Sequence, residues 1–242
     1  MRQKPILFST PMVQALLNTK PNVWPAEPID PGKPFKSMTR RVIKPQPDKE
    51  EPNINYCTIE GFQCAPPGEE IWADTEKGES VQLKPKYEKG DILWVRETWT
   101  CKGINDKDLR GLISYECGNW AWVQFDDPER YKKCIKKYQI KQPSIFLLRE
   151  AARLFLEVKS VRVERLQDIS EKDANAEGVN LHECDLYDEE REHCKFYVCS
   201  ACEHQTKKSC FSKLWNMLNA KRGYSWESNP WVWVYEFMKV EK

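Results

Sequence analysis

Apolar and polar residues alternate over short stretches along most of this chain, and a period of two is typical of half-buried β-strands. Residues 154–166 carry the longest such stretch, and their β-branched residues favour a strand over a helix. A Gly118-Asn119 pair inside 111–125 predicts a hairpin turn. The pattern predicts strands at residues 6–8, 42–43, 92–96, in the two arms of 111–125, at 154–166 and at 231–240.

Helical periodicity is restricted to three short segments. Ser9 or Thr10 can cap a helix that has Pro11 near its first position. Ser170 can cap a second helix, which carries Asp173 at its third position and should stop at Gly178. The third is amphipathic, with apolar residues from 211 to 218, and Gly223 follows it. Short strands and few helices predict an α+β fold, a small β-barrel with helices at its rim.

Composition limits the kinds of partner. The 242 residues suffice for a substantial core, and a formal net charge of +1 gives no global attraction to nucleic acid. Any such binding must come from local patches, for example the six basic residues and two tyrosines of 130–141, which otherwise form a solvated face. The longest apolar run is far too short for a membrane span, and the first residues do not resemble a secretory signal. We therefore expect a cytoplasmic protein with no membrane partner.

A candidate site begins at Lys36, after a proline-rich loop. A lysine and the hydroxyl of Thr39 lie three residues apart, and two guanidinium groups, Arg40 and Arg41, follow at once. Neighbouring residues on a strand face opposite ways, so one arginine should point inward, where burial is costly without an anion. A phosphate bound by the guanidinium fits this requirement. An internal ion pair with Glu97 or Glu177 is the alternative.

Cysteine and histidine gather in one segment. Five of the ten cysteines and all three histidines fall within 182–210. Cys199 and Cys202 have the spacing with which two thiolates hold one tetrahedral ion, and Cys194 and Cys210 can complete four ligands. A structural zinc ion would staple an acidic segment that has no core of its own. The alternative is a set of free thiols.

Several motifs occur in an order that resembles a known family. They are Ile-Leu-Phe-Ser at 6–9, Lys-x-x-Thr-Arg at 36–40, Gly-Asp-x-Leu-x-Val at 90–95 and Ser-x-x-Asp-Ala-x-x-Glu-Gly at 170–178. The chain resembles the ASCH domain, which belongs to the PUA-like superfamily of β-barrels, and in particular its long prophage-associated branch. The resemblance covers residues 4–44, 88–100, 143–180 and 211–240. It implies a single domain over 1–242, with insertions at 48–86, 101–142 and 181–210.

The resemblance implies an RNA- or nucleotide-directed role. Some small bacterial members are amidohydrolases that deacylate N4-acylated cytidines with a lysine, a threonine and a glutamate, which match Lys36, Thr39 and Glu177 here. Desolvation beside arginines lowers the pKa of a lysine, so that its amine can activate a threonine hydroxyl. A carboxylate can then pass the proton to the leaving amine. Two alternatives remain open: a module that binds RNA or a modified base without chemistry, and a phage-related interaction protein.

Further nucleotide contacts are expected at the end of the strand at 92–96 and just after it. Arg96 can bind a phosphate and Trp99 can stack a base, in addition to the contacts expected from Arg40 and Arg41. Arg96 can instead form a structural pair with Glu97. Three other tryptophans have strand spacing and should belong to the core: Trp94, Trp231 and Trp233.

Overall fold

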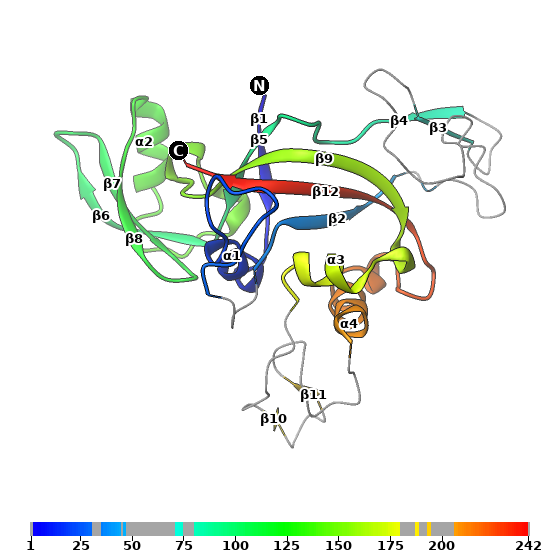
Figure 1. Ribbon diagram of the computed structural model, residues 1–242. Coiled ribbons are helices and arrows are strands. Elements are labelled where there is room, and N and C mark those ends of the chain that lie inside the picture. The colour runs from blue at the N-terminus through cyan, green and yellow to red at the C-terminus, as the bar shows by residue number, and fades with distance from the viewer. Residues whose placement is uncertain are drawn as a thin grey trace. The chain divides into compact units, whose positions relative to one another are not determined.

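The computed structural model describes residues 2–30, 35–44, 46, 71–74, 80–179, 187–188, 193–194 and 206–241 (Figure 1). The fold is mixed α+β, as the sequence predicted, with four α-helices and the two main sheets of five and three strands among these residues. The chain divides into two compact units. The first comprises residues 1–30, 90–157 and 238–242, and the second comprises 31–89 and 158–237.

The first unit contains the N-terminal strand. Strand β1 (Gln3–Leu7) pairs in parallel with β5 (Ile92–Arg96), and β5 pairs antiparallel with the first residues of β9 (Phe155–Arg165). Helix α1 (Thr10–Leu17) begins after Ser9, whose backbone is extended, and has Pro11 in its first turn. These elements confirm the predicted order of strand and helix.

A smaller sheet also belongs to the first unit. Strands β6 (Trp99–Asn105), β7 (Arg110–Tyr115) and β8 (Trp120–Gln124) form an antiparallel meander. Gly118 and Asn119, with φ of 93° and 68°, form the turn between β7 and β8, which confirms the hairpin. Helix α2 (Pro128–Ile135) packs on this sheet through Tyr131 and Cys134, and the short helices η1 (Ser144–Phe146) and η2 (Arg149–Ala151) follow.

The second unit contains the Lys36 segment. Strand β2 (Met38–Val42) pairs antiparallel with β12 (Trp231–Val240). After β9 and the short helix η3 (Leu166–Asp168), the Ser170 hydroxyl caps α3 (Glu171–Ala176) by accepting from the Asp173 amide at 3.0 Å. Gly178, with φ of 86°, follows α3, and Gly223, also at 86°, ends the turn η4 (Ala220–Arg222) after α4 (Lys207–Asn219). All three predicted helices are thereby confirmed.

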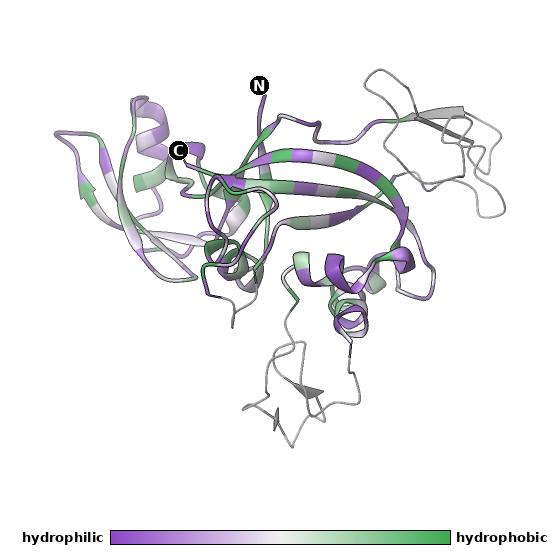
Figure 2. Ribbon diagram, viewed as in Figure 1, coloured by the Kyte–Doolittle hydropathy of each residue, from purple (hydrophilic) through white to green (hydrophobic). Residues whose placement is uncertain are grey.

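The core of the second unit lies where α3 and α4 pack beside β2 and β12. Its fully buried members include Leu166, Phe211, Trp215 and Val234. Apolar and polar residues alternate along β9, as the banding in Figure 2 shows. The three tryptophans that were expected in the core are buried, each 7% exposed: Trp94, Trp231 and Trp233.

The main sheet has the order β1-β5-β9-β12-β2, with β1 and β2 at its ends, so the closed barrel stays a prediction. Two short strands occur between residues 48 and 86, β3 (Ile71–Asp74) and β4 (Ser80–Leu83). Two-residue strands β10 (Tyr187–Asp188) and β11 (His193–Cys194) pair between residues 181 and 210. Within the described ranges, no helix is long and apolar enough to cross a membrane.

Candidate functional site

Lys36 and Glu177 meet in the second unit although 141 residues separate them in the chain. Their backbones form an antiparallel bridge, and the Ser37 amide donates to the Ala176 carbonyl at 2.9 Å. The Lys36 Nζ donates to the Glu177 carbonyl oxygen at 2.6 Å and to its Oε2 at 2.8 Å. The lysine is fully buried and the glutamate is 3% exposed. The main chain therefore fixes a buried amine against a buried carboxylate.

The surroundings of Lys36 make its amine easier to deprotonate than that of an exposed lysine. Burial lowers the pKa of the amine below the usual 10.5, and the nearby Glu177 carboxylate opposes part of that decrease. The positive charges of Arg41 and Arg40 lower the pKa further. Loss of hydration favours an uncharged amine because an ion is costly in a medium of low dielectric. The amine is therefore a weaker base than an exposed lysine and loses its proton at a lower pH.

Arg40 lies on the other side of Glu177. Its guanidinium donates to Glu177 Oε1 at 3.3 Å, to Glu164 Oε2 at 2.9 Å and to Asp173 Oδ2 at 3.1 Å. The residue is 3% exposed. The inward-facing arginine thus forms the internal ion pair with Glu177 that the sequence left as an alternative. A phosphate at this position would have to compete with three carboxylates.

Arg162 extends the same charge cluster. It donates to Asp173 Oδ2 at 3.0 Å and also contacts Glu164 and Glu236. Lys36, Arg40 and Arg162 supply three positive charges. The cluster has four carboxylates: Glu164, Asp173, Glu177 and Glu236. Near balance of this kind is what allows so many ionic groups to be buried together.

Thr39 and Arg41 lie on the opposite face of β2 from Arg40. In the β2–β12 pair, Thr39 is opposite Tyr235 and Arg40 is opposite Val234, and alternate residues of a strand face opposite ways. Thr39 is 1% exposed and Arg41 is half-buried. Burial lowers the pKa of Arg41, and Glu177 opposes this decrease most strongly. The alternation predicted for the two arginines is confirmed.

Tyr235 gives this face a response to alkaline pH. The phenol is 1% exposed, its oxygen accepts from the Lys86 amide at 3.2 Å, and burial raises its pKa to about 12. The unfolded chain loses this proton near the usual pH of 10.0, whereas the folded chain keeps it, so the free energy of unfolding should fall as pH rises between these values. We expect Tyr235→Phe to remove about 1–3 kcal/mol of that fall. Urea denaturation at both ends of this pH range measures it. The control is Tyr138→Phe, at a tyrosine that is 41% exposed. If the free energy of unfolding fell equally with pH in both variants, Tyr235 would not be the source of the fall.

Arg96 and Trp99 lie in the first unit. The sequence suggested that Arg96 could form a structural pair with Glu97, and this prediction is wrong. Glu97 pairs with Arg153, through Oε2 at 2.8 Å and Oε1 at 3.0 Å. The Arg96 guanidinium instead covers the Trp94 ring, 4.6 Å from its centroid. Glu97 follows β5 directly, and successive side chains along an extended chain point apart, which separates the two charges.

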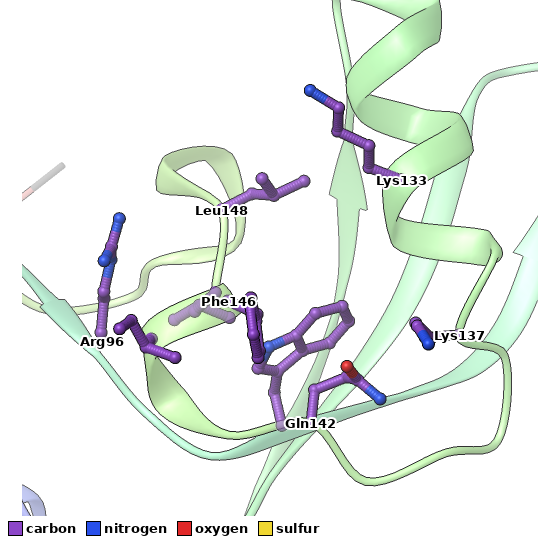
Figure 3. Close-up of a pocket in the computed structure, with 9 residues that line it drawn as sticks. Arg96, Lys133, Lys137, Gln142, Phe146 and Leu148 are labelled. Atoms are coloured by element: carbon purple, nitrogen blue, oxygen red, sulfur yellow. The ribbon is translucent and has the colours of Figure 1, made fainter.

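Arg96 and Trp99 share a cavity of about 430 Å³ (Figure 3). Trp99 is 4% exposed and packs in the core beneath the small sheet, so its ring is not free for a base to stack on. The two predicted nucleotide contacts are therefore neighbours within the first unit. Lys36, Thr39, Arg40 and Glu177 belong to the second unit.

The proposed zinc ligands lie almost entirely outside the described residues. Cys199 and Cys202 fall there completely, and of Cys194 only the backbone in β11 is described. Cys210 is buried in the first turns of α4, within the core of the second unit. In the parts of the chain that are described, no group of three or more metal-binding side chains occurs. The zinc site stays a prediction.

Three members of the charge cluster were missed from the sequence: Arg162, Glu164 and Glu236. Arg162 and Glu164 occupy alternate positions of β9, a signal that two charged residues share one face of a strand. The sequence did not show which buried residues this face of β9 would contact, so the charge cluster could not be predicted from it. Lys133 and Lys137, which line the cavity near Trp99, were visible only as part of a basic run.

Comparisons of the chain with family models, with curated proteins and with solved structures give no match.

Proposed function

We propose that this chain is a nucleotide- or nucleic-acid-directed protein of the ASCH type, with a PUA-like core, that deacylates N4-acylated cytidine-type bases. The observation that carries the proposal is the buried contact of 2.8 Å between the Lys36 amine and the Glu177 carboxylate. An amine with a lowered pKa beside a carboxylate is the combination needed to move a proton from a hydroxyl to a leaving nitrogen. Thr39, three residues after Lys36 and on β2, is proposed to supply the hydroxyl; because it lies on the opposite face of β2 from Arg40, the reaction requires a rearrangement that brings the hydroxyl to the amine.

The proposed reaction has two steps. The neutral Lys36 amine takes the proton of the Thr39 hydroxyl while the Thr39 oxygen forms a bond to the acyl carbon of the substrate. The bond from that carbon to N4 then breaks, and the proton passes through Glu177 to N4, which leaves as the free amine of cytidine. Water next attacks the threonine ester, with Lys36 again accepting a proton, and releases the carboxylic acid and the threonine hydroxyl.

Substrate access sets a condition on this reaction. Lys36 exposes none of its surface and Thr39 only 1%, so the acyl carbon reaches Thr39 only in a more open state of the second unit. Because the opening step limits turnover, we expect slow catalysis and a rate that depends on conditions that loosen the fold.

The test is the release of cytidine from N4-acetylcytidine, followed by chromatography. Turnover is expected to fall about 10²–10⁴-fold in Lys36→Met, because the proton acceptor is lost. Thr39→Val keeps the shape of the side chain and should abolish turnover, whereas Thr39→Ser should retain it. With the neutral amine as the base, kcat/KM should rise with pH through a pKa below the usual 10.5 of lysine.

A binding module without chemistry is the second candidate. It is favoured by the near balance of charge around Glu177, which by itself accounts for the burial of Lys36 and Arg40. Equilibrium dialysis with N4-acetylcytidine distinguishes the two candidates. Retention of the nucleoside without release of cytidine, unaffected by Thr39→Val, supports the module and excludes the amidohydrolase.

A further inference from the structure

The cavity of the first unit is built around a short backbone bridge between Trp99 and Gln142. The Trp99 amide donates to the Gln142 carbonyl at 3.1 Å, and the Gln142 amide donates back at 2.7 Å. This bridge fixes the start of the segment that follows α2. Pro143 then begins η1, which holds Ile145 and Phe146 at the cavity with 54% and 60% of their surfaces exposed. Two large apolar side chains are thus kept in water beside a cavity of about 430 Å³, a volume typical of small-ligand sites.

Three positive charges surround the same cavity. Figure 3 shows Arg96 on one side and Lys133 and Lys137 on the other, with Phe146 between them in this view. Lys133 and Lys137 are four residues apart, a spacing that places both on one face of α2 and its continuation. Among the residues that the structure describes, none of these three cations forms an ion pair.

The neighbouring basic residues behave differently. Within the same segment, Lys132 pairs with Glu129 at 2.8 Å and Lys141 pairs with Glu116 at 2.7 Å. Arg130 contacts Glu150. Among the described residues Lys136 also forms no ion pair, but it does not line the cavity, whereas the three lining cations combine the absence of a carboxylate with a place at the cavity. An unmatched group of this kind attracts an anion.

Two buried hydrogen-bond donors without an acceptor among the described residues belong to residues that line the cavity. The indole Nε1 of Trp99 and the Nε of Arg96 are buried, and neither has a hydrogen-bond partner in the described part of the chain. A buried donor without an acceptor costs free energy, and a bound acceptor would recover it. Trp99 itself is 4% exposed, so its N–H is held in place rather than free to turn to solvent.

We propose that this cavity binds a phosphomonoester that carries a flat ring, of the size of a nucleoside monophosphate. The apolar side chains of Ile145 and Phe146 suit the faces of a ring, and three unpaired cations suit a phosphate that carries two negative charges. The two unpartnered donors favour a ligand that carries hydrogen-bond acceptors. Such a group can be a free mononucleotide or the 5′-phosphorylated end of an RNA chain. The site is separate from Lys36 and does not rest on the proposed deacylation.

The test is isothermal titration of the whole chain with adenosine 5′-monophosphate, which has no acyl group and is not a substrate for deacylation. We expect binding that weakens as salt is added, with adenosine and inorganic phosphate each at least about tenfold weaker, because each lacks half of the recognised chemistry. A short RNA with and without a 5′-phosphate identifies the source. Tighter binding of the phosphorylated RNA than of the mononucleotide indicates an RNA end, and the reverse order indicates a free nucleotide; both support the site.

Two double variants test the location. Lys133→Gln/Lys137→Gln should weaken binding of the mononucleotide about tenfold, whereas Lys132→Gln/Lys136→Gln, with the same change of charge on the neighbouring face, should change it less than about twofold. Circular dichroism checks that both remain folded. Equal losses in the two variants, or no binding of mononucleotide and phosphorylated RNA by the native chain, would overturn the proposal. Deacylation of N4-acetylcytidine should be unchanged in both variants, so the outcome is independent of the proposed function.

Discussion

Glu177→Ala is expected to lower the free energy of unfolding by about 3–5 kcal/mol, because removing one partner of a buried ion pair leaves the other charge uncompensated. Here two cations lose a partner at once. The Lys36 Nζ loses a carboxylate oxygen at 2.8 Å, and the Arg40 guanidinium loses one at 3.3 Å. Lys36 has no exposed surface through which water could replace the carboxylate. Urea denaturation near neutral pH measures the loss.

The matched control is a lysine–glutamate pair on the surface. Lys132 and Glu129 also lie 2.8 Å apart, but their side chains are 67% and 72% exposed. Glu129→Ala should therefore cost less than about 1 kcal/mol. The double variant Lys36→Met/Glu177→Leu removes both charges and should recover much of the stability lost in Glu177→Ala. Similar losses in Glu177→Ala and Glu129→Ala would show that Glu177 does not compensate these cations.

Local sequence signals were sufficient for most of the elements in both units. Alternation predicted β9 and β12, although the first five residues of β12 are all buried, so that both faces of this strand are covered there. Residues that favour turns or helix caps marked where strands and helices begin or end. Asn119 adopts a positive φ in the β7–β8 turn, and Ser170 and Gly178 bound α3. The division into two compact units could not be predicted, because it depends on contacts between segments far apart in the chain.

The candidate site was predictable only in part. The proximity of Lys36 and Glu177 was expected only from the resemblance of the motif order to the ASCH domain, in which the matching residues form one site. The role of Asp173 was predicted only in part. The sequence placed it in the first turn of α3, but it did not show that its carboxylate accepts hydrogen bonds from Arg40 and Arg162. Nothing local in the sequence indicates which strand face meets that helix end, since this is decided by packing of the whole unit.

The basic segment at 130–141 shows the same limit. Its composition is compatible with a solvated face and with a binding patch. What separates Lys133 and Lys137 from Lys132 is position on α2, together with the bridge between Trp99 and Gln142 that brings η1 beside them. Helical spacing could group these lysines by face, but it could not show that one face borders a cavity.

Arg40→Met is expected to lower the free energy of unfolding by about 3–4 kcal/mol near neutral pH, since it leaves buried carboxylates without their shared cation. The guanidinium lies within 3.3 Å of oxygens from Glu164, Asp173 and Glu177. Without it, these groups repel one another in the folded state and take up protons more readily there than in the unfolded chain. A folded state that binds more protons loses stability as pH rises. The loss in free energy of unfolding caused by Arg40→Met should therefore be smaller at about pH 5 than at about pH 7.

Two further substitutions separate charge from geometry at this position. Arg40→Lys keeps the positive charge but cannot reach three carboxylates with one planar group, so its loss should be intermediate. Arg110→Met removes an exposed arginine that donates to Gln124 at 2.9 Å, and it should change stability by no more than about 0.5 kcal/mol. Denaturation of all four proteins at both pH values provides the measurement. A deficit in Arg40→Met that stays constant between the two pH values would mean that lost packing, rather than unmatched negative charge, causes the destabilisation.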